Sequence, residues 1–355
     1  MKFIHCSDIH LDSKMERNLS AGQARERNAE VCATFARMVD YARREGVRAV
    51  LIAGDLFDTR RASAQTAGFL LNLVGNAPEV DFLYLRGNHD EADRIFDGME
   101  LPENFKTFGP QWTSYRYENA VISGIEPKAW ENFYDELKLD GADVNIVMLH
   151  GQVDTRSGEE LIALPKLKNK NIRYLALGHL HSYRQERLDE DGVYAYCGCL
   201  EGRGFDECGE KGFVLLETGE DDLRAEFIPF ACRTLHEINV SITGLQTVSQ
   251  ILEAVRAAGG GIEEKDLVKF TLSGSFTPET QKDLRFLKKM LEDRYYFVKI
   301  KDETVLQISK EDYEHDASLK GEFVRLVMAS SRSREEKERM ILWGIRALSG
   351  EEVAP

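Results

Sequence analysis

The strongest constraint on the fold of this chain is a repeated pattern, in which a short apolar run is followed at once by a polar or glycine-rich cluster. The runs are rich in Val, Ile and Leu and are continuous rather than alternating, which is typical of strands buried on both faces. Helical spacing of apolar residues in Ala24–Glu45, between the first two runs, indicates an α/β fold with layered sheets. The five runs are Lys2–Cys6, Val47–Ala53, Val80–Leu85, Val144–Leu149 and Tyr174–Leu177.

The pattern changes in the second half of the chain. Three more strands separated by Asp/Gly turns follow the fifth run and are expected to complete a two-sheet sandwich. A small α+β unit then begins near His236, and within it we predict a helix over Pro278–Glu292 with Thr277 as its N-cap. We therefore expect a layered α/β domain over 1–235, a small α+β unit over 236–310, and C-terminal helices over 311–355 that either dock on their own domain or are offered to a partner.

Charge and cysteine content limit the functional classes. The 355 residues carry a formal net charge of −15, which argues against a protein that coats nucleic acid non-specifically but leaves room for a local basic site. The apolar runs are too short to span a bilayer, and the opening MKFIHCSDIH has no apolar signal region. The six cysteines are expected to be reduced thiols, so we predict a cytoplasmic protein.

Each apolar run ends in side chains that can bind metal ions. The carboxyl ends of parallel strands meet at one edge of a sheet, so these clusters are expected to converge in one crevice. Two carboxylates, one amide and four imidazoles suffice for two metal ions if one carboxylate bridges, and this donor set suits Mn, Fe, Zn or Ni. The predicted ligands are Asp8, His10, Asp55, Asn88, His150, His179 and His181.

Taken singly, each cluster also has an ordinary structural explanation. A lone H-x-H or G-N-H-D segment is common in surface turns and carries little information. Five clusters in chain order, which contain five of the eight His residues, are hard to explain as coincidence. A zinc site at Cys197, Cys199 and Cys208 is a weaker alternative, because the C-x-C spacing lacks a second pair.

The ordered set D-x-H, G-D-x-x-D, G-N-H-D, H-G and G-H-x-H resembles the calcineurin-like metallophosphoesterase superfamily over roughly residues 1–235. The resemblance implies a two-sheet αββα sandwich with two divalent metal ions at one edge. It implies that Asp8, His10, Asp55 and His181 hold one ion. Asp55 would bridge to a second ion held by Asn88, His150 and His179.

The expected chemistry is hydrolysis of a phosphoester by direct attack of a metal-bridging hydroxide, without a phosphoenzyme. His89 adjoins the ligand Asn88 and is predicted to be the general acid or a phosphate-orienting group. Asp58 is predicted to hold the tautomer of His89, with Asp90 as the alternative orienting residue.

Within the superfamily, the chain resembles the nuclease branch of the SbcC–SbcD type. D-I-H-L-D at 8–12, G-D-L-F-D at 54–58 and the block Cys197–Phe213 carry this resemblance, although Cys197, Cys199 and Gly202 depart from the usual block. It implies a Mn-dependent DNA exonuclease in DNA repair, with endonuclease activity left open, that acts with an SbcC-like ATPase. By the same resemblance, 1–235 is the metal-binding domain, 236–310 caps the site or contacts DNA, and 311–355 is a possible partner-binding arm. The resemblance also implies a homodimer, for which the helical segment Ala62–Val74 is a candidate interface, with core packing as an equal explanation of its apolar residues.

Arginines that follow the metal clusters are candidate contacts to a phosphodiester backbone, with ordinary surface charge as the alternative. Two other functions remain open. One is a metallophosphatase or phosphodiesterase that acts on a small molecule or phosphoprotein, and the other is a non-catalytic scaffold with structural metals. The arginines chosen as substrate contacts are Arg60, Arg94, Arg184 and Arg203, and Arg61 and Arg156 also follow the metal clusters.

Overall fold

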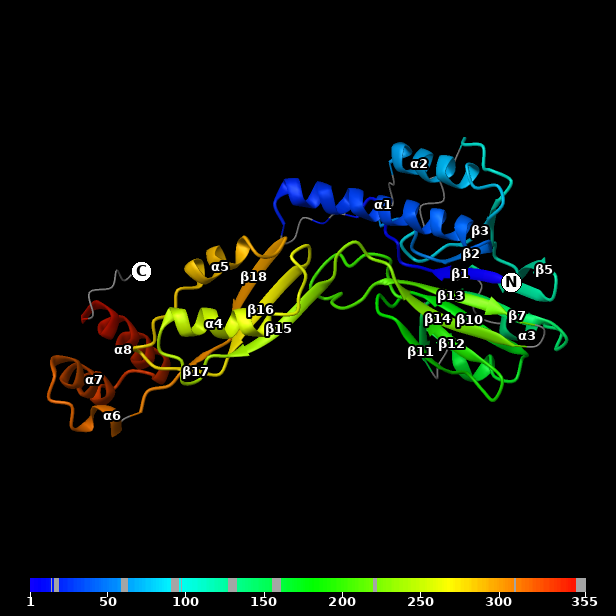
Figure 1. The fold of residues 1–355 in the computed structure, drawn as a ribbon. Coiled ribbons are helices and arrows are strands. Elements are labelled where there is room, and N and C mark those ends of the chain that lie inside the picture. The colour runs from blue at the N-terminus through cyan, green and yellow to red at the C-terminus, as the bar shows by residue number, and fades with distance from the viewer. Residues whose placement is uncertain are drawn as a thin grey trace. The chain divides into compact units, whose positions relative to one another are not determined.

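The structure is a computed structural model and describes residues 1–13, 15, 19–58, 63–90, 96, 98–126, 133–154, 161–219, 222–309 and 311–348 (Figure 1). The chain divides into two units, Met1–Thr234 and Leu235–Pro355, each with its own core. None of the helices in the described ranges is long and apolar enough to cross a membrane.

The first unit contains two six-stranded mixed sheets (Figure 1). In the first sheet, β1 to β4 run parallel, β13 pairs antiparallel with β1, and β14 pairs antiparallel with β13. Its order is β14 (Leu223–Pro229), β13 (Gly212–Thr218), β1 (Lys2–Cys6), β2 (Val47–Ala53), β3 (Asp81–Leu85) and β4 (Phe105–Thr107).

In the second sheet, the four central strands are parallel and the two edge strands are antiparallel to them. Its order is β11 (Arg184–Arg187), β12 (Val193–Tyr196), β10 (Ile172–Gly178), β7 (Val144–His150), β6 (Ala120–Gly124) and β5 (Thr113–Tyr117). A separate two-stranded ladder joins β8 (Gln152–Asp154) to β9 (Leu161–Ala163), and the short helix η2 (Leu164–Lys166) follows it.

The two sheets pack face to face around a fully buried core that includes Phe3 and Leu51 from the first sheet and Ile146 from the second. Helices α1 (Ala21–Arg44) and α2 (Ala64–Gly75) cover the outer face of the first sheet (Figure 1). The short helix α3 (Phe133–Glu136) packs on the outer face of the second sheet. This layering confirms the predicted αββα sandwich.

The second unit is built on the parallel sheet β15 (Leu235–Ser241), β16 (Leu267–Ser273) and β18 (Phe297–Asp302), with a small ladder between β17 (Ser275–Phe276) and β19 (Val305–Leu306). Helices α4 (Val248–Ala258) and α5 (Leu284–Glu292) pack on this sheet. A separate apolar cluster joins α6 (Glu311–Glu314), α7 (Leu319–Ala329) and α8 (Arg334–Leu348).

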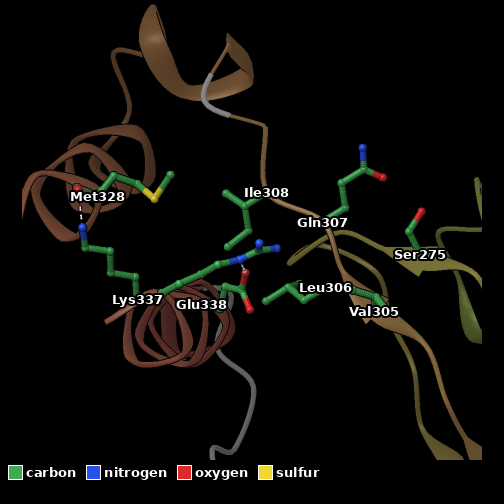
Figure 2. Close-up of a pocket in the computed structure, with 9 residues that line it drawn as sticks. Ser275, Val305, Leu306, Gln307, Ile308, Met328, Lys337 and Glu338 are labelled. Atoms are coloured by element: carbon green, nitrogen blue, oxygen red, sulfur yellow. Dashed lines mark hydrogen bonds and ion pairs between the residues drawn. The ribbon is translucent and has the colours of Figure 1, made fainter. Parts of the chain in front are cut away.

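A pocket of about 570 Å³ lies between β19 and the two helices α7 and α8 (Figure 2). Leu306, Ile308 and Met328 give it an apolar wall, and Arg334 and Lys337 lie at its α8 side.

The prediction that a helix begins at Pro278 is wrong. Thr280 instead closes a turn, since its hydroxyl accepts a hydrogen bond from the backbone N–H of Thr277 at 3.1 Å. Helix α5 begins at Leu284, because the Asp283 carboxylate accepts from the backbone N–H of Phe286 at 3.0 Å and caps the helix there.

Candidate metal centre

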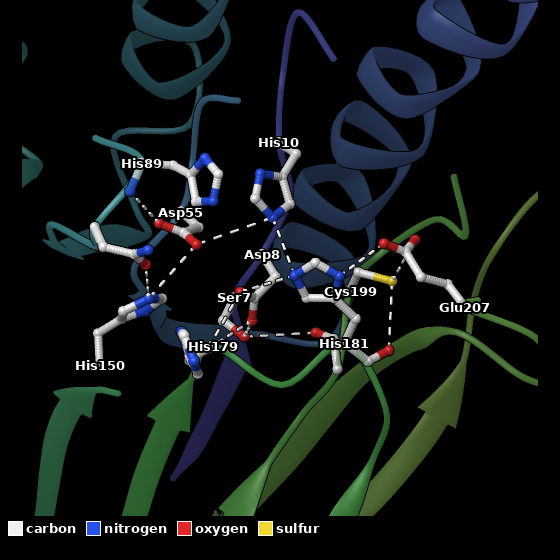
Figure 3. Close-up of polar contacts among 12 residues, drawn as sticks. Ser7, Asp8, His10, Asp55, His89, His150, His179, His181, Cys199 and Glu207 are labelled. Atoms are coloured by element: carbon white, nitrogen blue, oxygen red, sulfur yellow. Dashed lines mark hydrogen bonds and ion pairs between the residues drawn. The ribbon is translucent and has the colours of Figure 1, made fainter. Parts of the chain in front are cut away.

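The predicted ligands lie together at the edge of the sandwich where β1, β2, β3, β7 and β10 end (Figure 3). In the register of the second sheet, Gly178 at the end of β10 lies beside His150 at the end of β7. In the first sheet, the loop after β1 is bonded to the loop after β2: Asp8 N–H donates to Gly54 and His10 N–H to Asp55, both at 3.0 Å. Four chain segments are thus fixed around one crevice.

Several ligand residues have backbone conformations that non-glycine residues rarely adopt. The φ angles are +51° at Asp8, +51° at His10, +52° at Asp55 and +108° at His179. Such left-handed conformations cost free energy and cluster at functional sites, where the surrounding structure holds them in place.

Two glycines make room for the ligands. A Cβ at Gly54, whose φ is +91°, would lie 2.1 Å from Nδ1 of His150. A Cβ at Gly87 would lie 2.2 Å from Oδ1 of Asp55. Both glycines are therefore required by the close approach of a ligand side chain to the backbone.

One half of the centre is formed by Asp8, His10 and His181, whose ligand atoms lie within 4.8 Å of one another. The Nε2 atoms of His10 and His181 face each other at 3.2 Å (Figure 3). Oδ1 of Asp8 lies 3.6 Å from Nε2 of His181. The Asp8 carboxylate also accepts hydrogen bonds from the Ser7 hydroxyl and the backbone N–H of His179.

The other half contains Asp55, Asn88, His150 and His179. Nε2 of His150 lies 2.9 Å from Oδ1 of Asn88 and 3.5 Å from Oδ2 of Asp55. The same Asp55 oxygen lies 4.0 Å from Nε2 of His10, so this carboxylate reaches both halves. The ring of His179 packs edge-on against that of His150, with centroids 5.6 Å apart.

The charged groups in this crevice shift one another's pKa values. Burial raises the pKa of Asp55, but the hydrogen bond and positive charge of His150 and the charge of His10 outweigh it, and the net pKa falls well below the usual range. Burial lowers the pKa of His150, but its interactions with Asp55 and Asp8 reverse this and raise the pKa to about 9.

The donor set fits divalent metal ions. Nδ1 of His181 lies 2.7 Å from a Glu207 oxygen and Nδ1 of His10 lies 3.1 Å from an Asp58 oxygen. In the structure the two facing Nε2 atoms form a hydrogen bond at 3.2 Å whose donor depends on the tautomer. If each ring carries its proton on Nδ1, beside a carboxylate, both Nε2 lone pairs are available to one cation.

The residues predicted to assist the metal ions are arranged differently from the prediction. His89 is exposed, and its backbone N–H donates to Asp55 at 2.9 Å. The Asp58 carboxylate contacts His10 at 3.1 Å and Arg203 at 2.9 Å. One of its oxygens lies within 4.8 Å of a ring nitrogen of His89 without a hydrogen bond between the two side chains. The Asp90 carboxylate is buried and accepts backbone N–H groups of the two metal-binding loops, so it shapes those loops rather than orienting His89.

The predicted arginine contacts divide into two groups. Arg203 lies at the centre, paired with Asp58 and Glu207 at 2.9 Å each. Arg184 is exposed and paired with Glu186 on the edge strand β11. Arg60 and Arg94, together with Arg61 and Arg156, lie outside the described residues.

Sequence reasoning assigned no role to Glu207 or Ser7. Glu207 lies inside the block Cys197–Phe213, so the only available signal was its place in that block. None of the six cysteines, all of which the structure describes, forms a disulfide. Among them, Cys197 lies 3.0 Å from the Ser7 hydroxyl, and burial raises the pKa of the Cys197 and Cys199 thiols well above the usual value.

The sequence profile of the family described as calcineurin-like phosphoesterase matches residues 1–183, more than half of the chain. The chain belongs to this family. Members use a dinuclear site of divalent metal ions, and the clusters described above provide candidate ligands for one. The family confirms the predicted resemblance and the class of enzyme, a phosphoester hydrolase.

Curated relatives of this phosphoesterase are similar at low identity. An uncharacterized metallophosphoesterase, YhaO of Bacillus subtilis, is 29% identical over 64% of this chain and 60% of its own length. The DNA double-strand break repair protein Mre11 of Sulfolobus acidocaldarius is 24% identical over 88% of this chain and 85% of its own. The SbcD component of the nuclease SbcCD of Escherichia coli is 23% identical over 61% of this chain and 65% of its own.

Proposed function

We propose that this phosphoesterase is a metal-dependent DNA exonuclease of DNA repair that acts with an SbcC-like ATPase. The observation that carries the metal chemistry is the pair of Nε2 atoms of His10 and His181 facing each other at 3.2 Å beside the carboxylates. DNA as substrate is supported by the names of the similar proteins, which are Mre11 and a component of the nuclease SbcCD.

In this proposal, Asp8, His10 and His181 hold one metal ion and Asn88, His150 and His179 hold the other. Asp55 serves both, since its Oδ2 atom lies 3.5 Å from His150 and 4.0 Å from His10. When bound, two such ions polarise the phosphoryl group and lower the pKa of water enough to supply a nucleophile near neutral pH. We take Mn as the metal for the tests below, with Fe, Zn and Ni as alternatives.

The side chain of His89 is available for proton transfer. It is exposed at the mouth of the centre, and its ring lies edge-on to that of His10 with centroids 5.2 Å apart. We propose that His89 donates a proton from an imidazole nitrogen to the leaving oxygen of the phosphodiester. Because its backbone N–H is bonded to Asp55, the position of His89 is tied to the carboxylate that serves both halves.

For the second unit we propose DNA contact by residues 236–310 and partner binding by the helices of residues 311–355. The exposed apolar side chains Leu319, Leu326 and Trp343 of α7 and α8 support an interaction surface there. We also propose a homodimer that forms through α2, because the apolar side chains of Phe69 and Leu71 on that helix are only half-buried.

The experiment compares turnover of bis- and mono-p-nitrophenyl phosphate in Mn. We expect turnover of the diester by the wild type and at least about a hundredfold loss in Asp55→Asn, which removes the shared charge. A strong preference for the monoester would favour a phosphatase instead. Metal binding without turnover of either compound would favour a scaffold with structural metals.

A further inference from the structure

Two carboxylates lie behind the facing imidazoles of the candidate metal centre. Asp58 lies 3.1 Å from Nδ1 of His10, and Glu207 lies 2.7 Å from Nδ1 of His181. Each contact is on the ring nitrogen opposite the one that faces the centre. The Glu207 contact is a hydrogen bond, whereas the Asp58 contact is a short ion-pair distance that lacks hydrogen-bond geometry. The side chains are mostly shielded from water, with 20% of Asp58 and 7% of Glu207 exposed.

Arg203 joins these two carboxylates. Its Nη1 atom donates to Asp58 at 2.9 Å, and its Nη2 and Nε atoms donate to Glu207 at 2.9 and 3.2 Å. Its backbone N–H donates to the second Glu207 oxygen at 2.7 Å. All three guanidinium nitrogens therefore donate within the protein, which makes Arg203 a poor contact for a substrate phosphate.

The chain just before Arg203 is fixed to helix α1. The buried guanidinium of Arg27 donates to the Gly202 carbonyl at 2.8 Å and to the Glu201 carboxylate at 3.2 Å. The Thr34 hydroxyl donates to the same carboxylate at 2.7 Å. Because this backbone is held in place, the planar guanidinium is pre-organised to bridge two separate carboxylates.

We propose that Arg203 is a positioning residue that holds Asp58 and Glu207 against His10 and His181, and so directs both Nε2 lone pairs to one metal position. We call these three residues the Arg203 clamp. This inference rests on the dinuclear centre of the proposed function. Without the guanidinium, the two carboxylates repel each other and are free to turn away, and the two imidazoles lose the groups that fix their tautomer and orientation.

The test measures Mn binding by equilibrium dialysis and the electron paramagnetic resonance spectrum of the bound Mn. Two Mn ions, magnetically coupled, are expected in the wild type. In Arg203→Met we expect affinity at the His10–His181 position to fall about 10- to 100-fold while the other ion stays bound, which leaves the spectrum of isolated Mn. Arg203→Lys should recover part of the affinity, because one ammonium group keeps the positive charge but cannot span both carboxylates.

The matched control is Arg233→Met. Arg233 is similarly shielded, with 14% of its side chain exposed, and it also pairs with two carboxylates, those of Glu26 and Glu30. Neither partner contacts a predicted ligand among the interactions of the described residues, and the one link to the Arg203 loop is the pair of Glu30 with Arg27. This variant is expected to bind two Mn ions with wild-type affinity even if its melting temperature falls as far as that of Arg203→Met.

Glu207→Gln provides a second route if Arg203→Met does not fold, because it keeps the shape of the side chain and removes the charge. It should weaken the same metal position. Two Mn ions bound with wild-type affinity in the folded Arg203 and Glu207 variants would overturn this inference and leave the proposed function standing. A wild-type protein that binds no Mn would contradict the proposed function and the inference together.

Discussion

At the scale of single residues, the candidate centre combines predictable side chains with an unusual backbone. Asp8, His10 and Asp55 are the residue types that the ordered motifs predicted, but their left-handed φ angles near +50° carry no sequence signal. Glycine is the clearest indication of such conformations in a sequence, and the weaker preference of Asp and His for them does not locate them. The contacts among the loops hold these residues in place, and those contacts are visible only in the folded chain.

The exposed His89 is expected to act in proton transfer and not in metal binding. His89→Ala should therefore keep two bound Mn ions and lose about 10²- to 10⁴-fold in turnover of the diester. Equilibrium dialysis and steady-state kinetics on the same preparation separate the two properties. Full turnover with intact metal binding would remove His89 from the mechanism.

Gly54 is expected to be essential because a methyl group there would overlap the ring of His150. Gly54→Ala should lower the affinity for one Mn ion by about tenfold or more, since it displaces a ligand and strains a φ of +91°. The control is Gly68→Ala in helix α2, where an added Cβ meets nothing within 4 Å. That control should bind Mn normally and gain about 0.5–1 kcal/mol of stability.

His5, buried in the sandwich core beside Tyr174, is expected to make stability fall in acid. Burial lowers its pKa to about 3, whereas an unfolded His titrates near 6.5. Protonation therefore favours the unfolded chain. The stability that the neutral His5 side chain contributes is complete above pH 6.5 and declines as the pH falls towards 3. At pH 5 the loss is about 2 kcal/mol.

The check is urea unfolding of the wild type and His5→Phe at pH 7.5 and pH 5. The variant should lose about 2 kcal/mol less than the wild type between the two pH values, whatever its stability at pH 7.5. His315→Gln, at an exposed position, is the control and should follow the wild type. An equal loss in the wild type and His5→Phe would show that His5 is not held neutral.

At the scale of helices and strands, the sequence predicted the buried elements best. Continuous apolar runs marked β1 and β2 to the residue, because strands buried on both faces carry the clearest signal. Strand β5 was not predicted: it is a half-exposed edge strand whose sequence, TSYRY, lacks an apolar run. The start of α5 was misplaced because Thr277 and Asp283 are both good N-caps, and only tertiary contacts decide between them.

The N-cap of α5 gives a direct test of that correction. Asp283→Ala should cost about 1 kcal/mol of stability in the second unit, since it removes the acceptor of the Phe286 N–H. Thr277→Ala should cost less, because the Thr277 side chain caps no helix in the structure. Urea unfolding of both variants measures the difference. A larger loss in the free energy of unfolding of Thr277→Ala would support the helix start at Pro278 that the sequence predicted.

At the scale of the whole molecule, the candidate centre draws on six segments between residues 7 and 207 of a chain with net charge −15. The ligands were predictable because each follows an apolar run. The Arg203 clamp was not, since Arg203 and Glu207 lie in a loop without periodicity, and Asp58 and His181, which they contact, are far away in sequence. Net charge alone gives no indication of the local arrangement of cations and carboxylates.

The most direct test of the proposed nuclease activity is degradation of labelled single- and double-stranded DNA in Mn, with and without a candidate SbcC-like ATPase. We predict that the wild type shortens DNA from its ends, that chelation of Mn abolishes this, and that Asp55→Asn lowers the rate at least about a hundredfold. The ATPase should increase the rate on double strands. Intact DNA after incubation of the Mn-loaded wild type, alone and with the ATPase, would contradict the proposed activity.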